Sequence, residues 1–505
     1  MISPLLCLLL SCLLSFPTAA QAETSSPVSL PASGPVSSPV SLPASGPASA
    51  SGPVSCDIIA TPVPPPVQNT YAGRYTRRLH DVVQDVERRF GIRLRFDMDT
   101  VGLLLPYADY RIRPWSAEQT LTNICRYYDW NWWPRSGSLY RISRYEYYRR
   151  HDDEGRYMLD YLSTLYNNKE QWERRREALI GEVRQRLQID ALLDSCVSQP
   201  SAVLGRVCRH DGYTTQNICI ELTPGQHLFG TIYSPDRQRN ARRGTSRQQG
   251  RAPLIICPDG HWPSRYRDDE QQRLATLARM GAVCADFDLY GYGQSRAEVG
   301  EHAVARAHVF QAACGLRLLD YMLAHRHDID TTRIAVCGGS GGGTHTVLLA
   351  LLAESHNRRA LPAMLCRRFP ALAALAPVVH VASHFDGGCP CESGMPVHLA
   401  CGGTCEAELA AVFAPRPLLL VSDGGDWTHT TPELELPFIR RTYGFYGAER
   451  QVTNVHLPDE RHDFGPSKRQ AVYDFFARVF ALDRSQADES KVTIQSEEQL
   501  QSRLR

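Results

Sequence analysis

The chain has 505 residues, of which 43% are hydrophobic and 22% charged, and its 55 Lys and Arg residues against 54 Asp and Glu residues leave a net charge of +1. These proportions are ordinary for a globular protein, and the length suggests roughly two to four folded units. The charge balance excludes a globally basic nucleic-acid-binding protein and a polyacidic solvating chain, although it permits local charged patches.

Residues 1–22 are predicted to be a secretory signal peptide. An apolar run extends from Leu5 to Leu14, and Ala20-Gln21-Ala22 forms an A-x-A cleavage site, although no basic residue precedes the run. A lipoprotein signal acylated at Cys12 is the alternative, because Leu9-Leu10-Ser11-Cys12 resembles a lipobox. Both predict an exported protein, periplasmic or secreted, and the lipid-anchored form would stay at the outer membrane. No later segment is apolar enough to predict a membrane span.

Residues 23–69 are predicted to be a disordered linker. The segment SSPVSLPASGPV at 25–36 recurs almost unchanged at 37–48, and a Pro-rich stretch follows at 62–66. Ser, Pro, Gly and Ala bury too little apolar surface to order such a segment.

Residues 70–146 are predicted to form a small α+β domain of order α-β-β-α-β-β. A helix is expected over 74–90 and ends at Gly91, strands are expected at 92–96 and 110–113, a second helix starts at Ser116, and a hairpin closes around Ser136-Gly137. The pattern, above all the turn at 91–96, resembles the secretin/TonB short N-terminal (STN) domain. That resemblance implies an envelope protein as partner and no chemistry. The Tyr, Trp and Arg residues at 107–150 are interpreted as a small core with an Arg-rich surface, and a sugar- or protein-binding face is the alternative.

Residues 150–484 are predicted to form an α/β domain with a mostly parallel central sheet covered by helices. Apolar strands are expected at 254–257, 282–287, 333–337, 417–422 and 451–457, and a helix follows each of them. Two alternating strands at 217–222 and 228–234 precede this pattern. Residues 485–505 are a polar C-terminal tail that we expect to be frayed.

A G-x-S-x-G sequence, Gly338-Gly339-Ser340-Gly341-Gly342, lies between an expected buried strand and an expected helix. This strand–turn–helix context is typical of a nucleophile elbow, in which glycines allow a sharp turn and expose the serine hydroxyl. A phosphate-binding loop is the alternative, but no Lys follows in Walker spacing. Ser340 is therefore the predicted nucleophile.

A serine nucleophile needs a base and an orienting acid, in the chain order Ser, acid, His for this type of fold. His462 lies in the loop after the last expected strand, whereas His456 falls inside that strand. Asp426 lies in the loop after the preceding strand, and Asp423 at the strand end is expected to be a turn or cap residue. We predict Asp426 and His462 as the acid and the base.

The oxyanion of an acyl-transfer reaction needs two backbone N–H donors. We predict Gly341, which follows the nucleophile, as one donor. The second is expected from the loop after the strand at 254–257, as the N–H of either His261 or Trp262. The His261 side chain is expected to make loop contacts rather than act as an acid or base.

Four motifs in order resemble the α/β-hydrolase superfamily: the D-x-x-G-x-G-x-S loop at 288–295, the elbow, the acid and the late histidine. More closely, the chain resembles acetyl-xylan-esterase-like secreted hydrolases, on the residues Gly225, Gly260-His261-Trp262, Gly387-Gly388-Cys389-Pro390-Cys391-Glu392, Ala414-Pro415-Arg416-Pro417 and Gly425-Asp426-Trp427-Thr428. The resemblance implies hydrolysis of carboxylic esters on acylated carbohydrates, with no cofactor and no metal. Glu392 is expected to be a solvated surface carboxylate, and a position in the lining of the pocket is the alternative.

Fourteen of the 16 cysteines lie beyond the predicted signal peptide. Cys257, Cys284 and Cys337 lie in apolar strands and are predicted to be buried free thiols. Cys389, Cys391, Cys401 and Cys405 cluster in a Gly-rich segment, where one or two disulfides are expected and a zinc site is the alternative. Cys401 and Cys405 lie outside the pattern of the family.

Two other functions fit parts of the sequence. A peptidase of prolyl-oligopeptidase type shares the fold, but residues 70–146 are too short for the β-propeller that such a peptidase carries. A catalytically inactive scaffold that docks an envelope partner through the STN-like domain is the other alternative, and the presence of Ser340, Asp426 and His462 argues against it.

Overall fold

The computed structural model describes residues 75–502, except for 97–99, 113–115, 129, 135–137, 145–151, 198–201, 237–249, 263–264, 301, 303–305, 357–368, 386–391 and 393–394. The predicted signal peptide and linker, and residues Cys12, Cys389 and Cys391, lie outside the described residues. Within the described part of the chain, no helix combines the length and the apolar character that crossing a bilayer requires.

The first described segment, residues 75–144, contains short strands and amphipathic helices. In chain order these are β1 (Arg77–Arg78), α1 (Leu79–Phe90), β2 (Arg93–Phe96), β3 (Leu104–Leu105), α2 (Ala108–Arg111), α3 (Ala117–Tyr128), β4 (Trp130–Pro134) and β5 (Leu139–Arg144). The strands β4 and β5 form the predicted hairpin, and β2 pairs parallel to β5. Gly91 ends α1 with a φ of 64°, as a C-terminal glycine cap requires.

One predicted strand of this segment is wrong. Residues 110–113 were expected to be extended, but Ala108–Arg111 is a short helix, and the strand lies earlier, at Leu104–Leu105. The alternation of Tyr110-Arg111-Ile112-Arg113 is too short to distinguish a strand from one helical turn. The likeness to an STN domain stays a prediction.

Three helices lead into the main sheet: α4 (Asp152–Leu165), α5 (Lys169–Leu187) and α6 (Ile189–Ser195). Asn168 caps α5, and its side chain accepts a hydrogen bond from the Gln171 N–H. The buried face of α5 carries Trp172, Leu179 and Val183 among other residues, and it packs into the larger hydrophobic core.

The main sheet has ten strands in the order β15-β14-β13-β12-β10-β11-β9-β8-β6, with β7 paired to β8. Their bounds are β6 (Ala202–Leu204), β7 (Cys208–Arg209), β8 (Tyr213–Thr223), β9 (Gln226–Pro235), β10 (Ala252–Pro258), β11 (Val283–Phe287), β12 (Ile329–Gly339), β13 (Ala374–Val378), β14 (Leu418–Asp423) and β15 (Val452–Leu457). The strands from β15 to β11 are parallel, and β9, β8, β7 and β6 are joined in antiparallel pairs. This mixed sheet confirms the predicted α/β class.

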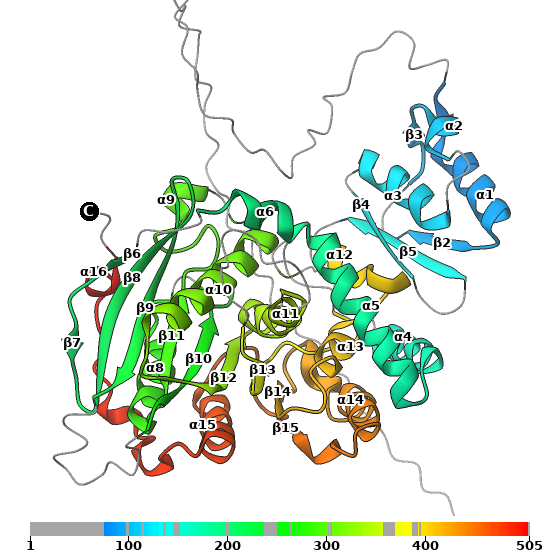
Figure 1. The fold of residues 1–505 in the computed structure, drawn as a ribbon. Coiled ribbons are helices and arrows are strands. Elements are labelled where there is room, and N and C mark those ends of the chain that lie inside the picture. Colours follow the sequence, from blue (N-terminus) through cyan, green and yellow to red (C-terminus); the bar gives the residue numbers. More distant parts are fainter. Residues whose placement is uncertain are drawn as a thin grey trace, which may run out of the picture. The chain divides into compact units, whose positions relative to one another are not determined.

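Helices cover both faces of this sheet (Figure 1). The core on one face includes residues of α10 (Arg306–His325), α11 (Gly341–His356), α13 (Glu406–Ala411) and α14 (Glu435–Gly444), and the core on the other face includes residues of α8 (Asp268–Met280) and α15 (Pro466–Phe480). Along β10, Leu254 and Ile256 join the first core and Ile255 and Cys257 join the second, because successive side chains of a strand point to opposite faces. The remaining short helices are α9 (Arg296–Val299), α12 (Met395–His398), α16 (Glu497–Leu500), η2 (Ala400–Gly402), η3 (Trp427–Thr430), η4 (Glu449–Gln451), η5 (Arg484–Gln486) and η6 (Glu489–Lys491).

Two further features of this domain differ from the expectations. Strand β13 was missed, because its alanines and Pro377 do not give the β-branched pattern by which strands are recognised. The C-terminal tail is not frayed through residue 502: Leu500 is fully buried, and the Ser502 hydroxyl donates to the Ile218 carbonyl of β8. Most of the tail faces solvent, which fits its polar composition, and the buried residues Gln495, Leu500 and Ser502 anchor it to the domain.

The described cysteines carry free thiols. Cys257, Cys284 and Cys337 are buried and unpaired, as predicted. Cys401 and Cys405 are also free, so the expected disulfides do not include them. Cys405 is held as the N-terminal flanking residue of α13, and the Cys401 N–H donates to Glu182.

Candidate active site

The predicted nucleophile elbow lies at the sharp turn between β12 and α11. Ser340 occupies this turn with a φ of 54°, a left-handed conformation that is strained for a residue with a Cβ atom. The glycines on either side are required by space: a Cβ on Gly338 would lie 2.6 Å from the Pro258 carbonyl oxygen, and one on Gly342 would lie 2.2 Å from it. The Ser340 N–H donates to the Val378 carbonyl of β13, which fixes the turn to the sheet.

His462, the predicted base, lies next to Ser340 in the loop between β15 and α15. Its Nε2 lies 2.9 Å from the Ser340 Oγ, and its Nδ1 lies 2.6 Å from the Asp426 Oδ2. Since an ionised carboxylate only accepts hydrogen bonds, Nδ1 carries a proton and donates it to Asp426. Nε2 of the neutral ring is then the acceptor for the Ser340 hydroxyl proton.

Asp426 lies in the loop after β14 and is buried, with 3% of its surface exposed. Its Oδ1 accepts hydrogen bonds from the Thr428 N–H, at 2.6 Å, and from the Thr428 hydroxyl, at 2.5 Å. Burial acts to raise the pKa of Asp426, but the hydrogen bonds from His462 and Thr428 outweigh it, and the pKa is lowered. The carboxylate therefore stays ionised beside the imidazole.

Asp423 and His456, which were not predicted as the acid and the base, have hydrogen-bond or ion-pair partners outside the Ser340 site. The Asp423 carboxylate accepts a hydrogen bond from the Gly425 N–H and pairs with the buried Lys468 ammonium at 3.0 Å. His456 lies within β15, and its Nδ1 is 2.9 Å from the Ser422 hydroxyl.

Two tryptophans flank the His462 ring. The Trp427 ring centroid lies 4.4 Å and the Trp262 centroid 6.3 Å from that of His462. Trp427 is fixed in turn, because its Nε1–H donates to the His380 carbonyl and its ring stacks on Phe385. The aromatic rings restrict the imidazole to the plane in which it contacts both Ser340 and Asp426.

Donors for an oxyanion lie around the start of α11. The Gly341 N–H is in the first turn of this helix, where backbone N–H groups have no partner within the helix. The Trp262 N–H donates to the Gly260 carbonyl at 2.8 Å and is engaged in its own loop. The backbone N–H of His261 therefore remains the candidate for the second donor. His261 lies close to Gly341, because its ring would be 2.9 Å from a Cβ built on that glycine.

Glu392 is part of the site, and its expected place on the solvated surface is wrong. The residue is 2% exposed, and the Ser340 hydroxyl lies 3.4 Å from its Oε1, longer than the contact to His462. The same Oε1 lies 3.2 Å from the His261 Nδ1, and the His261 Nε2 lies 2.9 Å from the His302 Nε2. The position of Glu392 beside Ser340 fits the alternative interpretation, a residue that lines the pocket. Its contacts join residues far apart in the sequence, so the local Gly-rich and Cys-rich context favoured the surface interpretation instead.

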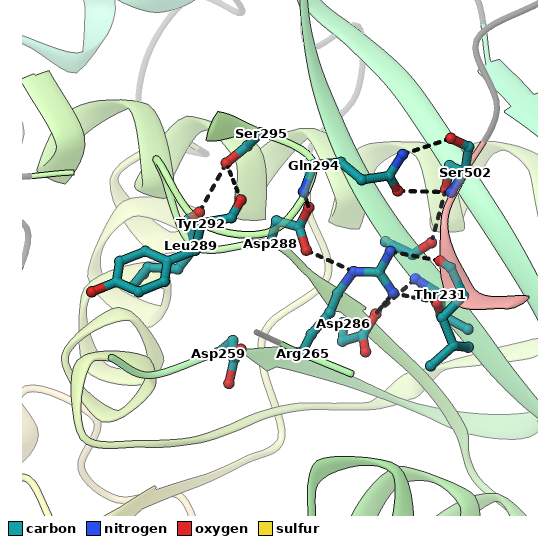
Figure 2. A network of polar contacts seen from close by, with 12 residues as sticks. Thr231, Asp259, Arg265, Asp286, Asp288, Leu289, Tyr292, Gln294, Ser295 and Ser502 are labelled. Atoms are coloured by element: carbon teal, nitrogen blue, oxygen red, sulfur yellow. Dashed lines mark hydrogen bonds and ion pairs between the residues drawn. The ribbon is translucent and has the colours of Figure 1, made fainter. Parts of the chain in front are cut away.

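The D-x-x-G-x-G-x-S loop is held by a separate polar network (Figure 2). The Asp288 carboxylate accepts hydrogen bonds from the Arg265 Nε, at 2.8 Å, and from the Gln294 N–H, at 2.8 Å. The Ser295 hydroxyl closes the loop on the carbonyls of Leu289 and Tyr292. A Cβ on Gly293 would lie 2.5 Å from Asp288, so this position requires glycine. The loop motif is therefore structural and supports β11 next to the site.

This geometry suits acyl transfer. A hydroxyl, an imidazole and a carboxylate form one hydrogen-bonded row, and helix N–H groups lie beside the hydroxyl. A group of three side chains elsewhere in the described residues, Asp152, His384 and His429, has the spacing of metal ligands.

The chain was compared with known proteins. No protein-family model and no curated protein sequence matches it. A solved structure named Methylesterase BT1017 is 53% identical, with 85% of this chain and 91% of that chain covered and a TM-score of 0.64. The chain belongs to the family of this methylesterase. Membership in the methylesterase family supports an esterase of the α/β-hydrolase type.

More distant structures also align. An acetyl xylan esterase from Paenibacillus sp. R4 is 15% identical, covers 59% of this chain and 94% of its own, and has a TM-score of 0.39. A glucuronoyl esterase from Teredinibacter turnerae is 13% identical, covers 62% of this chain and 86% of its own, and has a TM-score of 0.42. The assignment to the methylesterase family does not depend on them.

Proposed function

We propose that this protein is an exported serine hydrolase that cleaves carboxylic esters of carbohydrates, with Ser340 as the nucleophile, His462 as the base and Asp426 as the orienting acid. The observation that carries the proposal is the row of short contacts from Ser340 Oγ to His462 Nε2, at 2.9 Å, and from His462 Nδ1 to Asp426 Oδ2, at 2.6 Å. The predicted signal peptide supports export.

Acylation begins when the Ser340 Oγ forms a bond to the ester carbonyl carbon and its proton passes to His462 Nε2. The carbonyl oxygen becomes an oxyanion, which the Gly341 N–H and the donor at His261 stabilise. The imidazolium then gives its proton to the alkoxide oxygen as the ester bond breaks. The alcohol leaves, and the acyl group stays as an ester of Ser340.

Deacylation repeats these steps with water. His462 Nε2 takes a proton from the water, whose oxygen attacks the acyl carbon, and the second oxyanion uses the same donors. The bond to Ser340 Oγ breaks, Oγ recovers the proton from His462, and the carboxylic acid leaves. Asp426 remains ionised throughout and holds the Nδ1 proton in place.

We propose a methyl ester of a sugar carboxylate as the first substrate class. The support is the methylesterase relative at 53% identity, together with the sequence resemblance to carbohydrate esterases. A carbohydrate carries a methyl ester only where it has a carboxyl group, so the sugar is a uronic acid and the leaving group is methanol. The sequence resemblance instead predicts an acetyl ester. In an acetyl ester the sugar supplies the alcohol, and hydrolysis releases acetate as the acid.

The experiment measures both products on polymeric substrates. Purified protein is incubated with methyl-esterified polyuronate and with acetylated xylan, and methanol and acetate are quantified. We expect methanol release by the wild type and none above background by Ser340→Ala. Acetate release alone would make the protein an acetylesterase and contradict the methyl-ester proposal.

Two controls distinguish the alternative functions. A Pro-p-nitroanilide tests the peptidase, for which cleavage that Ser340→Ala abolishes would contradict the esterase assignment. Failure of the wild type on every ester, including p-nitrophenyl acetate, would instead favour an inactive scaffold. In either case the STN-like segment keeps its own proposal, which the sequence resemblance supports: it binds an envelope protein.

A further inference from the structure

Three side chains from separate parts of the chain meet beside the acid loop. Asp152 is the first residue of α4, His384 follows β13, and His429 lies in the short helix η3. The Asp152 Oδ2 lies 2.9 Å from the His429 Nε2, and the Asp152 Oδ1 lies 3.6 Å from the His384 Nε2. One ligand atom from each residue lies within 4.8 Å of the others.

The hydrogen bonds of His429 require a positive charge at this point. Its Nδ1 lies 2.8 Å from the Asp426 carbonyl oxygen, which only accepts, so Nδ1 carries the proton. In the neutral ring Nε2 is then an acceptor, yet it faces the Asp152 carboxylate, which also only accepts. The contact is favourable only if His429 is protonated or if a cation lies between the two atoms.

The backbone contact of His429 is one that metal-binding histidines commonly make. A histidine ligand usually donates its other ring N–H to a backbone carbonyl or carboxylate, which fixes the tautomer and leaves the free nitrogen for the metal. His429 has this arrangement toward Asp426. His384 is fully buried and its ring stands edge-on to that of His429, with centroids 5.7 Å apart.

We propose that Asp152, His384 and His429 form a structural site for a divalent transition metal such as Zn²⁺. Tetrahedral zinc with ligand bonds of about 2.0–2.1 Å places its ligand atoms about 3.3 Å apart. The two oxygens of the Asp152 carboxylate lie close to this spacing from the histidines, Oδ2 at 2.9 Å from His429 Nε2 and Oδ1 at 3.6 Å from His384 Nε2. Two imidazole nitrogens and one carboxylate suit zinc and its neighbours rather than Ca²⁺ or Mg²⁺, which prefer oxygen ligands. Asp152 is exposed, so a fourth, solvent ligand has access.

The site would tie α4 to the loop that carries the acid of the active site. His429 contacts the metal through Nε2 and the Asp426 backbone through Nδ1, so the ion would fix the backbone of the acid without touching substrate. The nearby packing already brings these parts together: a Cβ on Gly155 of α4 would lie 3.0 Å from the His384 Cβ. The metal is a positioning element, and the ester chemistry needs none of its Lewis acidity.

Metal binding by the tag-free, full-length protein tests the proposal. The protein is stripped with EDTA, dialysed and titrated with ZnCl₂ by calorimetry, with CaCl₂ as the comparison ion. We expect one Zn²⁺ per chain and no comparable binding of Ca²⁺. Asp152→Asn and His429→Gln, both at partly or fully exposed positions, should weaken the tight zinc site at least about tenfold, and circular dichroism should show that both variants fold.

A matched control and a structural readout complete the test. His227 pairs with Glu298 at 2.8 Å but belongs to no three-residue group among the described residues, so His227→Gln should bind zinc as the wild type does. A crystal soaked in ZnCl₂ should show a zinc anomalous peak between the three side chains. Wild-type binding that Asp152→Asn and His429→Gln leave unchanged, or a wild type that binds no zinc, would overturn the proposal.

The test of the metal site is independent of the test for ester hydrolysis. A protein that binds zinc at this site but hydrolyses no ester contradicts only the proposed function. A protein that hydrolyses methyl esters but binds no zinc contradicts only the metal site.

Discussion

Two buried aspartates, Asp426 and Asp286, differ in the number of donors that face them. Asp426 receives one hydrogen bond from His462 and two from Thr428. Asp286 lies within β11 and accepts one bond from the Thr231 N–H, while the Arg265 guanidinium is 3.8 Å away. Both are buried, so burial alone does not distinguish them.

Their pKa values move in opposite directions. Burial raises the pKa of Asp286 to about 7, because the attraction of Arg265 only partly offsets it and Glu270 adds a repulsive charge. Burial also acts to raise the pKa of Asp426, but His462 and Thr428 reverse the shift. A buried carboxylate thus stays ionised where several donors point at it and takes up a proton more readily where they do not.

The networks around them also differ in access. Arg265 is closed off from solvent: it donates to Asp288, to the Thr231 hydroxyl and to the Leu500 carbonyl of the C-terminal tail (Figure 2). The row at Asp426 has an open end, because the His462 side chain is 27% exposed. We therefore expect changes in the Arg265 network to act on stability and changes in the Asp426 row to act on activity.

The largest effect is expected for Asp426→Asn. The amide no longer stabilises the imidazolium and favours the wrong tautomer of His462, so kcat should fall by about 10³–10⁴-fold, with little change in the free energy of unfolding. Steady-state hydrolysis of p-nitrophenyl acetate and a urea titration measure the two quantities.

Asp423→Asn is the matched control for this change. Asp423 lies three residues earlier and pairs with Lys468 rather than with His462. It should lower stability and leave kcat of the folded protein within about tenfold of the wild type. If Asp423→Asn lost activity as completely as Asp426→Asn, the assignment of Asp426 as the acid would be contradicted.

The next largest effect is expected for Arg265→Met. Removing the guanidinium leaves the buried carboxyl groups of Asp288 and Asp286 without their cation, so each must either stay charged in the interior or take up a proton. The free energy of unfolding should fall by about 3–5 kcal/mol. The kcat of the folded fraction should change little. Arg174→Met, which breaks an exposed pair with Glu170, should cost less than about 1 kcal/mol in the same urea titration. An equal loss of unfolding free energy in Arg265→Met and Arg174→Met would contradict the view that the buried Arg265 contacts stabilise the fold.

Asp286→Asn should change how stability depends on pH. The pKa of Asp286 in the folded protein, about 7, lies above its value of 3.8 in the absence of these interactions. The stability that this group contributes is therefore fully present below about pH 4 and is lost as the pH rises through 7. Relative to the asparagine variant, the wild type should lose about 1–3 kcal/mol between pH 5 and pH 8. Parallel curves of unfolding free energy for the two proteins would contradict the raised pKa.

The smallest effect is expected for Glu392→Gln. Glu392 contacts the Ser340 hydroxyl at a longer distance than His462 does, so it positions the group rather than accepting its proton. The amide keeps an acceptor for His261 or Ser340, and kcat/KM should change by less than about tenfold. A loss as large as that of Asp426→Asn would make Glu392 the functional acid.

The sequence predicted those parts of the fold and site that depend on local pattern. The turn at Ser340 was predictable, because the G-x-S-x-G sequence lies directly between a buried strand and a helix, which is the local context of a nucleophile elbow. The loop positions of Asp426 and His462 followed from counting strands. The predicted helix that follows each apolar strand likewise needed only local periodicity.

The parts that sequence reasoning missed depend on contacts between distant residues. Glu392 is buried by His261 and Ser340, which lie more than 50 residues away along the chain. The C-terminal tail is ordered by Arg265 and by β8, although its own composition is polar. Strand β13 forms because β12 and β14 pair with it on both sides, and its Ala- and Pro-containing sequence gives no strand signal.

Covalent labelling tests the central claim most directly. An organophosphonate p-nitrophenyl ester reacts with an activated serine, releases p-nitrophenol and leaves a stable phosphonyl adduct. The wild type should release one equivalent of p-nitrophenol per chain, and peptide mass spectrometry should locate the adduct on Ser340, with labelling strongly slowed in His462→Ala. An adduct on another residue, or equal labelling of Ser340→Ala, would contradict the assignment of Ser340 as the nucleophile.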